Sequence, residues 1–191
     1  MTGVALVTQS KAHPLSERGH DLYETPEVAT RALLRSENLP HRIWEPACGR
    51  GAIMRVLRDA GHLVHGTDLV DYGAGVGDVD FLAQSEAPTG IDCILTNPPF
   101  KLATQFVAHG LTLCPKVIVL CRLAFIEGAK RVPIMGKCKR VHAFINRLPM
   151  MHRDGWEGPK SSSATAFAWF VFDRGHNAGV AELHWIRWEA A

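Results

Sequence analysis

Short apolar segments alternate with amphipathic segments along the middle of this 191-residue chain. Each apolar segment has the length of one strand, and the segments between them place apolar residues at helical spacing. The expected strands are residues 42–45, 62–69, 79–82, 91–96 and 116–123, and the expected helices are residues 52–60 and 102–113. Strands that alternate with helices are typical of a parallel sheet covered by helices on both faces.

The last third of the chain has a different pattern. Residues 140–148 and 164–173 are both strand-like, and the polar segment 150–163 between them predicts an antiparallel hairpin. A last strand is expected near residues 183–188. The fold class predicted by the whole pattern is therefore α/β: a Rossmann-like, doubly wound, mostly parallel seven-stranded sheet with an antiparallel C-terminal hairpin.

The N-terminal part begins with a polar, aperiodic segment. Residues 1–19 are predicted to form a flexible arm, and residues 20–191 are predicted to form a single domain. A helix is expected to begin around residue 25, with Thr25 as its N-cap, Pro26 at the first helical position and Glu27 in the first turn.

Composition narrows the function classes. The longest apolar runs are far shorter than a bilayer requires, and the N-terminus has no secretory pattern, so we expect a cytoplasmic protein without a membrane partner. Five cysteines without paired spacing do not indicate a disulfide framework or a zinc site. His62 and His65 lack a convincing ligand spacing, and no metal is expected. A net charge of +2 does not by itself indicate a nucleic-acid-binding protein.

A glycine loop follows the first expected strand. Gly49 and Gly51 stand between that strand and the next helix, where the missing Cβ lets backbone approach a ligand. Asp68 follows about twenty residues later, at the end of the second expected strand, and such an acid can accept both hydroxyls of a ribose. Residue 54 is Met, so the full dinucleotide-binding glycine spacing is absent. The pattern therefore favours a nucleoside cofactor other than a dinucleotide.

The segment Asn97-Pro98-Pro99-Phe100 follows the fourth expected strand and indicates the chemistry. Proline has a carbonyl but no N–H, so this turn presents acceptors and few donors, and Asn97 adds a side-chain carbonyl. Two such acceptors can take both hydrogens of an aryl amino group and direct its lone pair at a methyl donor. Phe100 can stack on a planar substrate. This segment therefore predicts transfer to an exocyclic amino nitrogen without a strong base.

These motifs resemble those of class I S-adenosylmethionine-dependent methyltransferases that act on amino groups. Residues 46–51 and 97–100 carry the resemblance, together with Asp21-Leu22-Tyr23-Glu24-Thr25-Pro26, and the DNA adenine-N6 branch is the closest match. The resemblance spans roughly residues 21–173. It implies S-adenosylmethionine as the cofactor and adenine in DNA as the target.

The resemblance also implies roles for individual residues. The methionine part of the cofactor would lie by Tyr23, Thr25 and Pro26, and the cofactor loop would be lined by Glu45, Ala47, Gly49 and Gly51. The ribose would be held by Asp68, with Leu69 beside it, and the adenine by Asp80 and Phe81. The amine to be methylated would be held by Asn97, Pro98, Pro99 and Phe100.

The chain is too short for the separate target-recognition domain that this branch commonly has, and it is similar to compact methyltransferases of phage or prophage type. Sequence reading would fall to the loops at residues 71–77 and 150–163. The candidate nucleic-acid-binding residues are Lys101, Arg153, Trp156 and Lys160. RNA adenine, cytosine N4 and protein glutamine remain alternative targets, and a non-catalytic cofactor-binding subunit is an alternative of another class.

Overall fold

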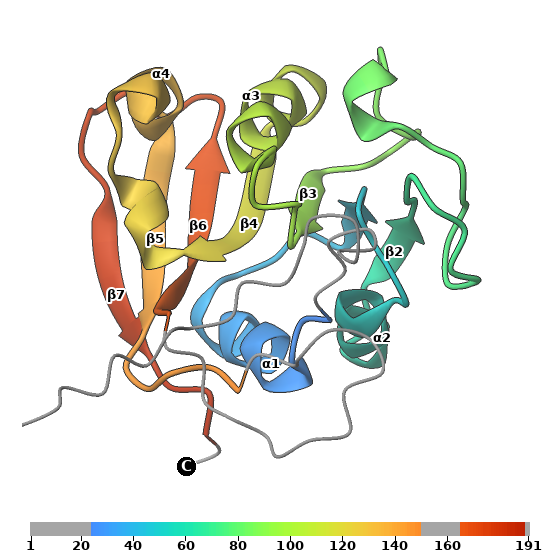
Figure 1. The fold of residues 1–191 in the computed structure, drawn as a ribbon, viewed down its shortest axis with the longest axis horizontal. Helices are drawn as coiled ribbons and strands as arrows, with labels where there is room; N and C mark the ends of the chain where they lie inside the picture. Colours follow the sequence, from blue (N-terminus) through green and yellow to red (C-terminus); the bar gives the residue numbers. More distant parts are fainter. Residues whose placement is uncertain (1–23, 150–164, 190–191) are drawn as a thin grey trace, which may run out of the picture.

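The computed structural model describes residues 24–149 and 165–189, which contain one sheet of seven strands (Figure 1). The strands, in chain order, are β1 (Arg42–Glu45), β2 (Leu63–Gly66), β3 (Cys93–Thr96), β4 (Lys116–Arg122), β5 (Cys138–Phe144), β6 (Phe167–Asp173) and β7 (Glu182–Ile186). Their order across the sheet is β2-β1-β3-β4-β6-β5-β7. Only β6 among these described strands runs antiparallel to its neighbours, which confirms the predicted fold class.

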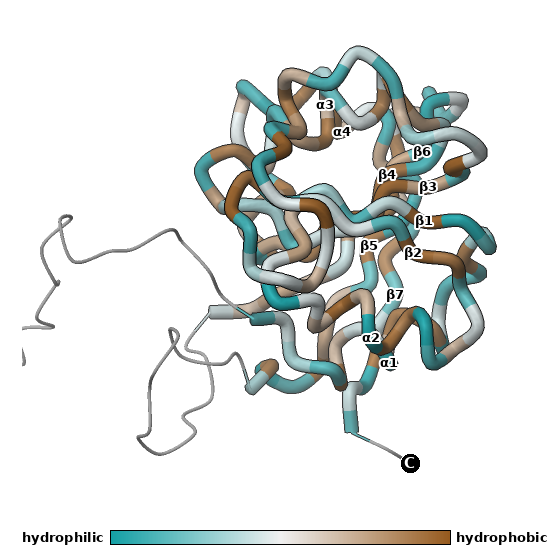
Figure 2. Tube along the Cα trace, turned by 90° about the vertical axis from the view of Figure 1, so that its right-hand side faces the viewer, coloured by the Kyte–Doolittle hydropathy of each residue, from teal (hydrophilic) through white to brown (hydrophobic). Residues whose placement is uncertain are grey.

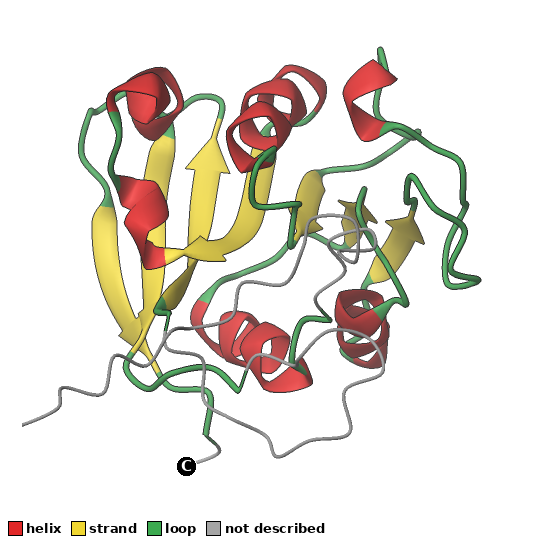
Figure 3. Ribbon diagram, viewed as in Figure 1, coloured by secondary structure: helices red, strands yellow, loops and turns green. Residues whose placement is uncertain are grey.

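Helices cover both faces of the sheet (Figure 3). One face packs against α1 (Glu27–Ser36) and α2 (Ala52–Asp59), and the other against α3 (Ala103–Leu113), with α4 (Val132–Met135) beside it. Because successive strand residues point to opposite faces, neighbours in the chain belong to different cores. Ile43 packs with α1 and α2, whereas Trp44 packs with α3. The hydrophobic stretches accordingly gather along the central strands β3 and β4 (Figure 2).

The predicted strand at residues 79–82 is wrong. This segment contains a 3₁₀ helix instead, η2 (Phe81–Ala83). The Asp80 carboxylate accepts a hydrogen bond from the Leu82 N–H at 2.9 Å, so a local side-chain cap holds this backbone in a turn. Beyond β2, Thr67 pairs instead with Val76 in a single parallel bridge.

The predicted start of the first helix is also wrong in detail. Helix α1 begins at Glu27, and Pro26 occupies the N-cap position with an extended ψ of 134°. No side chain caps this helix, and the Thr25 hydroxyl instead accepts a hydrogen bond from Asn97. The Thr25 hydroxyl, which the local sequence predicts to cap α1, therefore pairs instead with a residue that is distant in the chain.

The C-terminal strands confirm the hairpin of β5 and β6 and the last strand, β7. Since β7 pairs with the outer side of β5, the hairpin lies inside the sheet, and β7 forms the edge. Within residues 24–149 and 165–189, no helix combines the length and the apolar character needed to span a bilayer.

Candidate active site

A pocket of about 300 Å³ lies where β1, β2 and β3 reach their carboxyl ends. Ligand sites of open α/β sheets occupy this position, and the volume suits a small molecule. The predicted site residues that line the pocket are Thr25, Glu45, Ala47, Gly49, Asp68, Leu69, Asp80, Phe81, Asn97, Pro98, Pro99 and Phe100. The structure therefore brings the glycine loop and the Asn-Pro-Pro-Phe turn to one cavity, although they are about fifty residues apart in the chain.

Two predicted cofactor residues, Pro26 and Gly51, are not among the residues that line the pocket. Gly51 has a φ of 77° and sits at the N-cap of α2, so its glycine is required by the turn. Pro26 directs the chain from Thr25 into α1. Tyr23 lies outside the described residues.

The Asp68 carboxylate orders the glycine loop. Its Oδ2 accepts a hydrogen bond from the Gly49 N–H at 2.8 Å, and its Oδ1 accepts one from the Val70 N–H at 3.0 Å. The Cys48 N–H also donates to the Thr67 carbonyl at 3.0 Å, so the loop is tied to the end of β2 at two points. Each carboxylate oxygen has a second lone pair that can accept a hydroxyl.

Glu45, the last residue of β1, is the buried acid of the site. Its side chain lines the pocket at 2% exposure, and Oε2 has no hydrogen-bond partner among the described residues. Burial raises the pKa of this carboxyl well above its usual range, and the nearby Asp68 charge adds to the effect, against a hydrogen bond from the Met54 backbone. A carboxyl held this way is suited to a polar or cationic ligand group that would complete its hydrogen bonding.

The amide of Asn97 is held from outside its own loop. Its Nδ2 donates to the Thr25 hydroxyl at 3.1 Å, which connects the turn after β3 to the residues that precede α1. Phe100 lines the same pocket, and its ring lies 6.0 Å from the ring of Phe167 and 4.8 Å from the Arg122 guanidinium.

Asp80 and Phe81 both line the pocket, with different surroundings. Phe81 is 2% exposed, and its ring packs against Trp44 at 5.2 Å and Phe106 at 4.7 Å. It therefore belongs to the core and forms the pocket wall at once. Asp80 is exposed and uses one carboxylate oxygen to cap η2.

A wall of the pocket that the sequence did not predict comes from the segment between β2 and η2. Val70, Tyr72 and Val79 line the cavity. The Val76 N–H donates to the Gly66 carbonyl at 2.9 Å, and the Val76 carbonyl accepts from the Asp68 N–H at 3.0 Å. The loop at residues 71–77, predicted to read the target sequence, thus pairs with the end of β2. The three glycines at positions 73, 75 and 77 are the sequence feature that could have predicted such close backbone packing.

The sequence assigned no individual role to the other lining residues, which are Glu24, Pro46, Cys48, Arg50, Ala52, Ile53, Leu82, Leu102 and Phe106. Burial raises the pKa of the Cys48 thiol to about 12, so this sulfur is not poised as a nucleophile. Among the described residues, no group of histidine, cysteine or acidic side chains could hold a metal ion.

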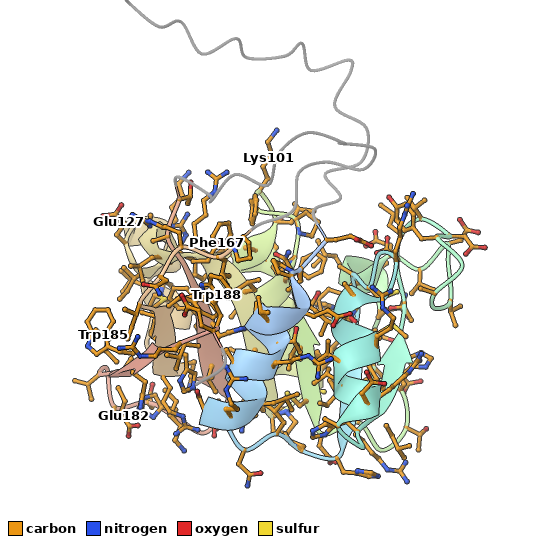
Figure 4. All side chains as sticks on the ribbon, turned by 90° about the horizontal axis from the view of Figure 1, so that it is seen from below. Lys101, Glu127, Phe167, Glu182, Trp185 and Trp188 are labelled. Atoms are coloured by element: carbon orange, nitrogen blue, oxygen red, sulfur yellow. The ribbon has the colours of Figure 1, made fainter. Side chains whose placement is uncertain are left out.

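Of the predicted nucleic-acid-binding residues, Lys101 is exposed and follows Phe100 directly. Figure 4 shows its side chain extending from the same side of the molecule as Phe167. Arg153, Trp156 and Lys160 lie outside the described residues.

The fold is similar to that of several solved structures. A putative RNA methyltransferase from Pyrococcus horikoshii has a TM-score of 0.57 at 11% identity, with 80% of this chain and 86% of that one covered. A modification subunit of a putative type I restriction enzyme from Vibrio vulnificus has a TM-score of 0.55 at 14% identity, with 85% of this chain and 46% of that one covered. Magnesium protoporphyrin IX methyltransferase from Synechocystis, with bound SAM, has a TM-score of 0.51 at 16% identity, covering 76% of each chain. These similarities show a shared fold.

No protein-family model matches the sequence, and no curated protein matches it.

Proposed function

We propose that this chain is an S-adenosylmethionine-dependent methyltransferase that methylates an exocyclic amino nitrogen, with adenine N6 in DNA as its target. The observation that carries the proposal is that Asp68 and Asn97 line one pocket. Asp68 holds the glycine loop, which suits a nucleoside, and Asn97 begins the turn that suits an amine. Several solved structures with this fold are named as methyltransferases, including one with bound SAM, which supports the same assignment.

The residues present fit this cofactor. Asp68 would accept hydrogen bonds from the ribose hydroxyls, and the glycine loop would lie against the rest of the nucleoside. The buried Oε2 of Glu45 has no hydrogen-bond partner among the described residues, which suits the polar methionine end. Phe81 and Leu69 offer apolar surface to the adenine ring. When bound, the cofactor supplies a methyl group on a positively charged sulfur.

The protein's part in the transfer is positioning. The Asn97 side-chain oxygen and the Pro98 carbonyl would each accept one hydrogen of the target amino group. Holding both hydrogens places the nitrogen lone pair out of the ring plane, toward the methyl donor. The fixed acceptors would also stabilise the positive charge that develops on the nitrogen as the donor leaves as a neutral thioether. The methylated nitrogen would then lose one proton to solvent, so no strong base is needed for the transfer.

A nucleic-acid base is proposed because the turn suits a planar aromatic amine with a phosphate nearby, and adenine in DNA follows from the resemblance that residues 97–100 carry. Phe100 provides an aromatic face, and the exposed cation Lys101 follows it in the chain. A base in a duplex would have to leave the stack to reach Asn97, as it does in other enzymes that act on bases. Two of the solved structures with this fold are named as an RNA methyltransferase and a restriction-enzyme modification subunit.

The proposal is tested by supplying cofactor labelled on the methyl group with DNA lacking adenine methylation, with RNA, and with protein extract. We expect label in DNA, and methyladenine on nucleoside analysis. The variant Asn97→Ala should bind cofactor with unchanged affinity but transfer methyl groups orders of magnitude more slowly. Label that entered protein alone would refute the nucleic-acid target, and cofactor binding without transfer to any substrate would favour a non-catalytic subunit.

A further inference from the structure

Arg122 covers the aromatic ring on which the proposed function relies. It is the last residue of β4, and its guanidinium carbon lies 4.8 Å from the centre of the Phe100 ring. In the sheet Arg122 pairs with Phe167, whose ring is 6.0 Å from the Phe100 ring at an interplanar angle of 45°. Phe100 lines the pocket but Arg122 does not, so the guanidinium lies outside the cofactor cavity.

A second arginine–phenylalanine pair offers a comparison. The Arg131 guanidinium also lies 4.8 Å from an aromatic centre, that of Phe125. The Arg131 side chain is anchored by hydrogen bonds to the carbonyls of Ala124 and Glu127, whereas the exposed side chain of Arg122 makes no hydrogen bond or ion pair with the described residues. The ring is therefore the contact that holds the Arg122 guanidinium, and such an exposed cation–π contact is weak enough to be exchanged for another stacking group.

We propose that Arg122 and Phe100 form a nucleotide subsite, in which a target base displaces the guanidinium from the ring and the guanidinium then binds the adjoining backbone phosphate. This inference rests on the proposed function and specifies which group of the substrate Arg122 recognises. A guanidinium and a base are both planar and both stack on phenyl rings, so one can replace the other at the same surface.

The chemistry of the displaced group selects the kind of substrate. A guanidinium has five N–H donors and matches the geometry of a phosphate with two parallel hydrogen bonds. A nucleotide carries its phosphate close to its base, so both groups of the subsite can engage one residue of nucleic acid. A glutamine side chain in a protein offers neither an aromatic ring nor a phosphate.

The test compares Arg122→Gln with the matched variant Arg131→Gln, using the full chain, labelled cofactor and DNA lacking adenine methylation. Arg122→Gln should raise the KM for DNA about tenfold, as expected for one lost charge-assisted hydrogen bond. The plot of log KM against log salt should become shallower by roughly one unit. Arg122→Lys, which keeps the charge, should keep most of the salt dependence. Arg131→Gln should change neither quantity.

The possible outcomes separate the two proposals. Unchanged KM in Arg122→Gln, with DNA still methylated, overturns the subsite and leaves the proposed function standing. An equal rise of KM in both glutamine variants also overturns it, since that reports a general charge effect. If the unaltered protein methylates no nucleic acid, the proposed function itself fails. Cofactor affinity and the unfolding temperature, measured on each variant, establish that the protein is folded.

Discussion

The Asn97 side chain donates a hydrogen bond from Nδ2 to the Thr25 hydroxyl at 3.1 Å, across 72 residues of sequence. Thr25 precedes α1, and Asn97 begins the turn after β3. Because an amide has its donor at one end and its acceptor at the other, this bond determines which way the amide faces. With Nδ2 directed at Thr25, the side-chain oxygen is the end that would accept a hydrogen from the substrate amine, and in the proposed reaction Thr25 would act as a positioning residue.

Replacing Thr25 by valine removes this hydroxyl at nearly constant volume. Thr25→Val should lower kcat about tenfold, because a neutral hydrogen bond contributes about 1 kcal/mol. Without this bond the Asn97 amide could turn, and its N–H₂ group would then face the N–H groups of the substrate amine. Thr25→Ser should retain most of the activity. The measurement is kcat under saturating cofactor, with cofactor Kd from calorimetry. A loss that appeared in the cofactor Kd, with kcat intact, would instead make Thr25 a ligand of the cofactor.

Asp68 organises the glycine loop through two hydrogen bonds that its carboxylate accepts from backbone N–H groups. Asp68→Ala should weaken cofactor binding about a hundredfold, because it removes the proposed acceptor for the ribose hydroxyls and also releases the Gly49 and Val70 N–H groups. Calorimetric titration with the cofactor measures this. Asp59→Ala, at an exposed acid at the end of α2, is the matched control and should bind normally. If the two variants bound the cofactor with similar Kd values, Asp68 would not be a ligand of the cofactor.

Most of the strands were predictable because each rests on a local pattern of apolar residues. The run Arg42–Glu45 forms a strand as predicted, and Gly49 and Asn97 reach one pocket because the carboxyl ends of parallel strands share one edge of a sheet. The Asn97–Thr25 bond could not be predicted, because no local pattern encodes a contact over 72 residues. The error at residues 79–82 arose where a side-chain cap from Asp80 outweighed weak strand propensity.

Glu37 connects the end of α1 to the sheet through a buried ion cluster. Its carboxylate is 3.1 Å from Lys116 Nζ, 2.7 Å from Arg140 and 3.0 Å from His142 Nε2. Burial alone would raise the pKa of this carboxyl, but hydrogen bonds from His142, Arg140 and Lys116 outweigh burial and hold the pKa well below its usual range. Glu37→Gln should lower the free energy of unfolding at pH 7 by about 3 kcal/mol, since it leaves Lys116 and Arg140 without their carboxylate partner.

The pH dependence of that difference has a definite sign. Because the folded-state pKa of Glu37 lies below the ordinary value of 4.5, its contribution is complete above that value and is lost as the pH falls toward the folded-state pKa. Urea unfolding from pH 7 to pH 3 should show that the difference in unfolding free energy between Glu37→Gln and the unaltered protein becomes smaller as the pH falls below about 4.5. Glu27→Gln breaks an exposed pair with Arg31 at 3.3 Å and should cost under about 1 kcal/mol. If the difference in unfolding free energy between Glu37→Gln and the unaltered protein stayed constant down to pH 3, the lowered pKa of Glu37 would be contradicted.

Gly75 allows the loop at residues 71–77 to pack on the end of β2. A Cβ at this position would lie 2.5 Å from the Gly66 carbonyl oxygen and 2.8 Å from the Cys48 sulfur. The first of these neighbours is backbone, so the loop itself must move. Such movement would break the bond from the Val76 N–H to Gly66 and displace Asp68, whose own N–H donates to the Val76 carbonyl.

Gly75→Ala should therefore raise the cofactor Kd at least tenfold and destabilise the fold by about 1–3 kcal/mol, the usual cost of overpacking. Gly136→Ala is the matched control, because its Cβ would meet only ordinary contacts at 3.8 and 3.9 Å and its φ of −60° suits any residue. Cofactor titration and thermal unfolding measure the two effects separately. If Gly75→Ala lowered the unfolding temperature but kept cofactor affinity, this loop would support the fold without shaping the site. A loss of both, absent in Gly136→Ala, would make the loop part of the cofactor wall.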